Sequence, residues 1–112
     1  MADAFRIELD RSGARLSGEL DLAAYPRASE ELAPLFGSSQ EVTLDLSDVG
    51  FLDSSGIRLL IRLQKSLVGE GVLVLRSPKA HVVRVLEIAG LPDLGVRIED
   101  AMGEDEASSG EG

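Results

Sequence analysis

The sequence predicts an α/β fold whose mostly parallel central sheet opens with an N-terminal β-hairpin. Three observations support this prediction: an alternating apolar stretch near the start, a turn signal directly after it, and a later succession of β-rich runs and helical patterns. Strands that alternate with helices are joined by crossovers, which place successive strands parallel in one sheet. The expected order is β-β-α-β-α-β-α-β, with the helices packed on the sheet.

The first two strands are expected to pair as the hairpin. Apolar and charged residues alternate over 5–10, which is typical of a half-buried strand. Ser12-Gly13 signals a turn, and residues 14–20 are interpreted as the returning strand.

A helical pattern over residues 22–36 follows the hairpin. Pro26 is compatible with a first helical turn, whereas Pro34 is expected to end or kink the helix because proline lacks the N–H group. The run Gly37-Ser38-Ser39 then predicts a loop.

The middle of the chain predicts two more strands around a second helix. Residues 42–46 form a short β-rich run, expected to be a central strand, and residues 54–68 have a helical pattern that ends at Gly69 to Gly71. Residues 72–75 are apolar without alternation, which favours a strand covered on both faces.

A third helix and a last strand complete the expected fold. Ser77 and Pro78 are typical of the N-cap and the first helical position, and Gly90 is expected to end the helix. Residues 96–98 are interpreted as a short final strand.

Composition divides the chain into a domain over 1–99 and an acidic tail over 100–112. From Glu99 onward the sequence has six acidic residues and no basic residue, and residues 1–98 have fourteen acids and eleven bases. A segment so acidic and so poor in large apolar side chains is expected to be disordered, because it cannot bury enough surface to offset its ordering entropy.

The same composition argues against several classes of protein. Neither part has the positive charge that nucleic-acid binding requires, and the apolar runs are far shorter than the roughly 20 residues of a membrane span. The start of the chain has no signal-peptide pattern. The absence of cysteine excludes disulfides and thiolate metal sites and favours a cytoplasmic location. We expect no metal and no cofactor.

The segment FLDSSGIRLL, residues 51–60, carries the most specific motif of the chain. A serine nucleophile needs a neighbouring base, but the only histidine is His81 on the third predicted helix, and G-x-S-x-G is absent. No P-loop lysine follows the glycine. Asp45 lacks the other acidic residues of a phospho-acceptor aspartate site and is interpreted as a strand-end or polar-face residue. We therefore expect no enzymatic activity.

Helix capping is the simplest explanation of the motif. Asp53, Ser54 or Ser55 can each accept hydrogen bonds from the exposed N–H groups of the following helix. Capping needs only one such residue, however, and it does not explain Gly56, which costs stability in a first helical turn.

Three segments together resemble the STAS domain, and more narrowly the anti-sigma factor antagonists of bacteria. They are GELD at 18–21, VTLDLSDVGFLDSSGIRLL at 42–60 and VLVLRSPKAHVVRVLEIAGL at 72–91, and the similarity extends over about residues 5–99. The resemblance implies a single STAS domain in which Ser54 is the phosphoacceptor, with Ser55 the less favoured choice. It also places Asp21 beside the same loop, on the partner-binding surface.

The resemblance further implies a partner-switching function. The unphosphorylated form would bind an anti-sigma factor that is also a serine kinase and would free a sigma factor; phosphorylation at Ser54 would break the complex. A serine phosphatase would restore the first form. The alternative is a non-switching STAS scaffold subunit of a transporter or signalling assembly. Such relatives often alter the phosphorylatable serine, so Ser54 favours the switch.

The surroundings of Ser54 suit such a switch. The N-terminus of a helix favours an anion, and Gly56 is hypothesised to leave the loop open to a kinase. Arg58, Arg62 and Lys65 form a basic stripe that is either a solvated face or a docking surface for an acidic groove. Arg58 stands where the family often has glycine. The expected partner-binding residues are Asp21, Asp53, Ser54, Ser55, Gly56, Arg58 and Arg62.

Overall fold

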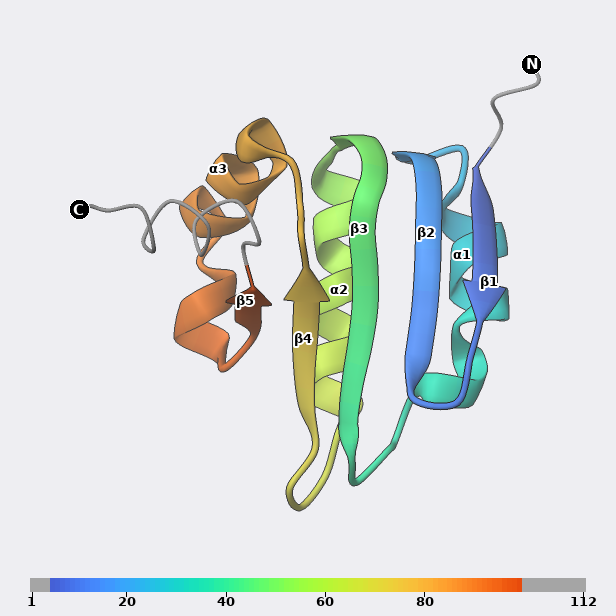
Figure 1. Ribbon diagram of the computed structural model, residues 1–112, viewed down its shortest axis with the longest axis vertical. Helices are drawn as coiled ribbons and strands as arrows, with labels where there is room; N and C mark the ends of the chain where they lie inside the picture. The colour runs from blue at the N-terminus through green and yellow to red at the C-terminus, as the bar shows by residue number, and fades with distance from the viewer. Residues whose placement is uncertain (1–4, 100–112) are drawn as a thin grey trace.

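A five-stranded sheet with the spatial order β1-β2-β3-β4-β5 is the frame of the protein, and its computed structural model describes residues 5–99 (Figure 1). The predicted tail over 100–112 lies outside the described residues. The elements, which include two short 3-10 helices η1 and η2, are β1 Arg6–Leu9, β2 Gly13–Leu20, α1 Tyr25–Glu31, η1 Ala33–Leu35, β3 Glu41–Leu52, α2 Ser54–Ser66, β4 Val72–Arg76, α3 Ala80–Ile88, η2 Leu91–Leu94 and β5 Arg97–Glu99.

The pairing of the strands confirms the predicted fold class and element order. β1 and β2 are antiparallel, with the Asp10 N–H donating to the Gly13 carbonyl at the turn, and every later pair is parallel. The α-helices lie behind the sheet in Figure 1, all on the same face. Within residues 5–99 the opposite face therefore carries no helix.

Strand β3 is much longer than the predicted run over 42–46. Val42, Leu44 and Leu46 are buried at the spacing of two that a strand gives, but the next buried residues are Val49 and Leu52, each three positions further. The register with β2 shifts twice, and each time β3 contains one extra residue. These bulges keep the apolar side chains on the core face although the spacing changes.

The first helical segment is shorter than expected and divided. α1 begins at Tyr25 rather than at residue 22, and Pro34 lies in the separate 3-10 helix η1. The expectation that Pro34 would end or kink the helix is confirmed.

The predicted start of the third helix is wrong. α3 begins at Ala80 with Lys79 as its N-cap. Ser77 has a left-handed backbone (φ 54°), and its N–H group donates to the Glu99 carbonyl at 2.6 Å, so it joins β4 to β5 instead of capping the helix. Gly90, with φ 82°, ends α3 as predicted.

Strand β4 is buried on both sides, as its composition predicted, although helices cover only one. Val74 is 0% exposed and lies outside the main apolar cluster. On the helix-free face the Arg97 guanidinium, on β5, donates to Glu41 Oε1 on β3 at 2.7 Å and so crosses β4. Arg97 is the register partner of Val74, so its side chain leaves β5 beside this buried position before it reaches Glu41.

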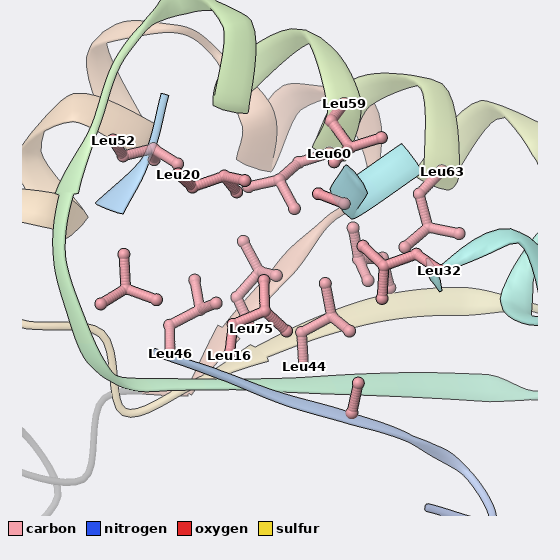
Figure 2. Packing of buried hydrophobic residues seen from close by; sticks show 14 of the residues in the cluster. Leu16, Leu20, Leu32, Leu44, Leu46, Leu52, Leu59, Leu60, Leu63 and Leu75 are labelled. Carbon is pink, nitrogen blue, oxygen red and sulfur yellow. The ribbon is translucent and has the colours of Figure 1, made fainter. Parts of the chain in front are cut away.

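The apolar core lies between α2 and the helix-covered face of the sheet (Figure 2). Figure 2 shows leucines of α2 facing leucines of β2, β3 and β4, and the labelled residues are Leu16, Leu20, Leu32, Leu44, Leu46, Leu52, Leu59, Leu60, Leu63 and Leu75. This packing holds α2 against the sheet, with its first turn near the ends of β2 and β3.

Candidate functional site

Two loops meet at the edge of the sheet where the parallel strands β2 and β3 end. Leu20 and Leu52 are register partners, and Asp21 and Asp53 follow directly after them. Gly18 of the GELD motif has φ 97°, a left-handed backbone that favours glycine, and the register shift between Gly18 and Glu19 follows immediately. The two sequence motifs are therefore neighbours in space.

Asp53 is the residue that joins these loops. Its Oδ1 accepts hydrogen bonds from Ser55 N at 2.8 Å and Gly56 N at 3.2 Å, so Asp53 is the N-cap of α2. Its Oδ2 accepts from Leu22 N, in the other loop, at 3.2 Å. Of the three capping candidates in the sequence, Asp53 is the one whose side chain performs this task.

Asp21 organises the loop that follows β2. Its Oδ1 accepts from Ala24 N at 3.0 Å, and its backbone carbonyl accepts from Tyr25 N at 3.0 Å. These bonds form the turn that leads into α1. Asp21 thus lies beside the DSSG loop (residues 53–56), where the sequence placed it, and it also has a structural task.

The two serines of the DSSG loop have opposite environments. Ser54, the first residue of α2, is exposed, whereas Ser55 is only 9% exposed. Within residues 5–99 the Ser54 hydroxyl makes no hydrogen bond, so no such bond has to break before the hydroxyl can react. A modifying enzyme can reach Ser54 without unfolding the helix, which is not true of Ser55.

Gly56 is buried, which corrects the idea that it keeps the loop open. A Cβ at this position would lie 2.5 Å from the Leu20 carbonyl oxygen and 2.6 Å from Leu52 Cδ1. Glycine is required here because the first turn of α2 packs directly on the backbone at the end of β2. The access to Ser54 comes from its own position on the helix surface.

The basic stripe of α2 is only partly free. Arg62 donates to the hydroxyl of Tyr25 on α1, so it helps to hold the two helices together. Arg58 and Lys65 are exposed, and within residues 5–99 neither side chain has an ion pair or a hydrogen bond. Arg58 is the member of the stripe closest to the DSSG loop.

Two exposed apolar residues beside the loop were not identified in the sequence. Leu22 is 71% exposed and its N–H group donates to Asp53; Phe51 is 46% exposed and lies two residues before Asp53. Phe51 stands between the buried Val49 and Leu52, and the bulges of β3 decide which of the three faces outward. These two side chains add exposed apolar surface to the edge of the sheet where the loops meet.

Asp45 lies on the helix-free face of the sheet, away from the loop. Burial raises the pKa of its carboxyl, but hydrogen bonds from Ser47 and the nearby Arg15 and Arg76 outweigh this effect and lower the pKa below its ordinary value. Arg15 also forms a 2.7 Å ion pair with Asp48, and both this hydrogen bond and the charge of Asp48 raise the pKa of Arg15. Asp45 is a polar-face residue, as the sequence suggested.

Other chemistry is sparse in the part of the chain that the structure describes. His81 Nε2 lies 2.7 Å from the Gly50 carbonyl oxygen, so a ring N–H there ties α3 to β3. Residues 5–99 contain no cluster of three or more His, Cys, Asp or Glu side chains able to hold a metal ion. None of the helices in this range combines the length and apolar character needed to cross a membrane.

The sheet order, the GELD motif at the end of β2 and the capped serine loop define a protein of the STAS class. The family model described as "STAS domain" matches residues 11–104, and the chain belongs to this family. The curated relatives include the anti-sigma-B factor antagonist of Bacillus subtilis (strain 168), which is 29% identical over 80 residues, 70% of this chain and 73% of that protein. The anti-sigma-B factor antagonist of Listeria monocytogenes is 30% identical over 92 residues, 80% of this chain and 79% of that protein.

Solved structures agree with this fold. An anti-sigma factor antagonist from Mycobacterium paratuberculosis has a TM-score of 0.64 at 24% identity, over 86% of this chain and 84% of that one. The anti-sigma factor antagonist SpoIIAA in its unphosphorylated form has a TM-score of 0.59 at 22% identity, over 91% and 93%. At these identities the structures support the fold, and together with the relatives they confirm the resemblance to anti-sigma factor antagonists.

Proposed function

We propose that the protein is an anti-sigma factor antagonist controlled by phosphorylation of Ser54. In its unphosphorylated form it binds an anti-sigma factor with serine kinase activity and frees a sigma factor. The observation that carries this proposal is the exposed Ser54 hydroxyl at the first position of α2, directly after its capping residue Asp53, in a chain of the STAS family. The buried position of Ser55 supports Ser54 as the acceptor.

The binding surface of the proposal consists of the DSSG loop and its neighbours. The exposed side chains there are apolar at Leu22 and Phe51, polar at Ser54 and basic at Arg58. A partner that covers apolar groups and pairs with a cation gains both affinity and orientation. Asp53 contributes by holding the two loops together, Asp21 by forming the turn after β2, and Gly56 by the close packing of α2.

Phosphorylation needs only a hydroxyl from this chain. Ser54 Oγ attacks the γ-phosphorus of ATP bound by the partner, an O–P bond to serine forms, and the bond between the γ-phosphorus and the ADP oxygen breaks. The hydroxyl proton passes to a base of the kinase. The proposal therefore assigns no catalysis and no cofactor to this chain.

The phosphate then separates the partners by charge and volume. It adds roughly −1.5 to −2 charges near neutral pH at a position close to Asp21 and Asp53. A hundredfold loss of affinity requires only about 2.8 kcal/mol, and a poorly paired phosphate inside an interface is able to exceed this cost. A serine phosphatase reverses the step, with water attacking phosphorus, inorganic phosphate leaving and the serine hydroxyl returning.

Intact-mass analysis of the protein isolated from its own cells tests this function. We expect a fraction heavier by one phosphate in the wild type and in Ser55→Ala, and no such fraction in Ser54→Ala. The absence of the heavier form from the wild type under every growth and stress condition would contradict the switch. It would instead favour the non-switching scaffold, in which the DSSG loop serves only as a cap and docking loop.

A further inference from the structure

The exposed stripe of α2 begins at the proposed phosphoacceptor itself. Ser54, Arg58 and Arg62 follow one another at intervals of four residues, and all three are exposed. Residues four apart lie on the same helix face with about 5–6 Å between their Cβ atoms. Helical side chains generally lean toward the N-terminus, which puts Ser54 within the reach of the long Arg58 side chain.

The two arginines of this stripe differ in their present contacts. Arg62 donates to the Tyr25 hydroxyl on α1. Arg58 has neither an ion pair nor a side-chain hydrogen bond within residues 5–99. Arg58 can therefore pair with a new anion without first losing an ion pair or a hydrogen bond of this structure.

The N–H groups at the start of α2, which could otherwise bind a phosphate on Ser54, already donate to Asp53. Asp53 Oδ1 accepts from both Ser55 N and Gly56 N, and Ile57 N donates to the Asp53 carbonyl. The Asp53 carboxylate also places a negative charge next to the phosphate, as does Asp21 in the neighbouring loop. The favourable charge within one helical turn is Arg58.

We propose that Arg58 forms an ion pair with the phosphate on Ser54 within the same chain. This inference rests on the proposed function, because it takes Ser54 as the phosphorylated residue. An acid that precedes a base by four residues is the favourable orientation for a helical pair, and a guanidinium can donate two hydrogen bonds to a phosphate.

This pairing gives phosphorylation a second effect on the complex. In the unphosphorylated form Arg58 is available to an acidic group of the partner. In the released form Arg58 is paired with the phosphate instead. One modification thus adds a charge to the surface and removes a cation from it. The pair also offsets the repulsion from Asp21 and Asp53, so the released form keeps the first turn of α2.

The test is a phosphorus NMR titration of the full chain with phosphoserine inserted genetically at position 54. This preparation needs neither the kinase nor the anti-sigma factor, so its result is independent of whether the proposed function holds in cells. The second pKa of a phosphoserine is about 6, and a nearby cation lowers it because the dianion is favoured. The matched variants are Arg58→Gln, Arg58→Lys and Arg62→Gln.

We expect the phosphate pKa to be higher in Arg58→Gln than in the wild-type sequence by at least about 0.3 units at low ionic strength. Arg58→Lys should restore most of the difference, and Arg62→Gln should leave the pKa unchanged. A smaller difference for Arg58→Gln, or an equal rise in Arg62→Gln, would overturn the pairing. Because Arg58 is exposed and its side chain has no ion pair or hydrogen bond within residues 5–99, its loss should leave the fold intact.

Discussion

Gly56 lies where α2 begins and where the backbone at the end of β2 passes beneath the helix. Its missing side chain lets the helix approach the Leu20 carbonyl, and this approach fixes the height of Ser54 above the sheet. Asp53 then satisfies two N–H groups of the first turn and one of the neighbouring loop. Gly56, through close packing, and Asp53, through helix capping, therefore set the local geometry of the site.

Replacement of Gly56 by alanine is expected to destabilise the protein by about 1–3 kcal/mol, because the new methyl group overlaps the backbone of β2. Urea unfolding followed by circular dichroism measures this. Gly50→Ala is the matched control, since a Cβ at Gly50 has no atom within 4 Å and Gly50 is not among the glycines with positive φ. Equal free energies of unfolding for Gly56→Ala and the wild type would contradict this prediction, because the helix would then have moved away from β2 without loss of stability.

Strands and loops decide which side chains form the proposed docking surface. β3 contains two more residues than the stretch of β2 beside it, and this excess turns Phe51 outward between two buried residues. The loop after β2 presents Leu22 next to the same site because its backbone is bound by Asp53. The apolar part of the proposed docking surface is thus a property of two elements together.

Leu22→Ser and Phe51→Ser are each expected to weaken binding to the anti-sigma factor by about tenfold to a hundredfold, since a large apolar side chain contributes roughly 1.5–3 kcal/mol when buried. Calorimetric titration of the complex measures the change. Val68→Ser is the control, because Val68 is 55% exposed but follows the opposite end of α2. If all three variants bound like the wild type, the partner would not cover the loop.

Asp45 connects three strands through charge. It is the register partner of Arg15 on β2 and Arg76 on β4, and its pKa is lowered in the folded state. A lowered carboxyl pKa contributes stability above the ordinary value, here 3.8, and this contribution disappears as the pH falls through the folded-state pKa.

Asp45→Asn is therefore expected to be less stable than the wild type near neutral pH, by about 1 kcal/mol or less. The difference should shrink as the pH falls below 3.8, which urea midpoints at a series of pH values would detect. Asp93→Asn is a control, because the Asp93 side chain makes no ion pair or hydrogen bond within residues 5–99. A gap that stays constant with pH would mean that charge is not the cause.

The parallel strand order of the whole molecule brings the candidate site residues together. Because β2 and β3 run in the same direction, both end at one edge, and the loops that follow them meet there. The pairing of β2 with β3 is therefore enough to bring the two loops of the candidate site together. The helices on one face hold this edge in place through the leucine core.

At the same scale we propose that the folded domain ends at Glu99, where β5 ends its pairing with β4. Deletion of residues 100–112 should change the free energy of unfolding by less than about 0.5 kcal/mol, the range of a surface change that removes no packing. Thermal or urea unfolding measures it. A loss of several kcal/mol would place part of the acidic segment inside the cooperative unit.

The sequence by itself determined the order of elements, the hairpin, the helix stop at Gly90 and the two motifs of the site. Each of these depends on local chemistry: alternation, turn residues, a capping carboxylate and a glycine with left-handed backbone. Ser54 and Asp21 were named through the family resemblance of the two motifs, and their roles stay predictions. The family comparison confirmed the resemblance that those motifs carried.

The tertiary structure alone decided the remaining features. The bulges that lengthen β3 arise from its pairing with β2, so the exposure of Phe51 has no signal in its own segment. Gly56 is explained by a backbone 36 positions earlier in the chain, and Ser77 by its bond to Glu99. Local propensity covers a few residues, whereas register, close approach and exposure depend on which distant segment lies alongside.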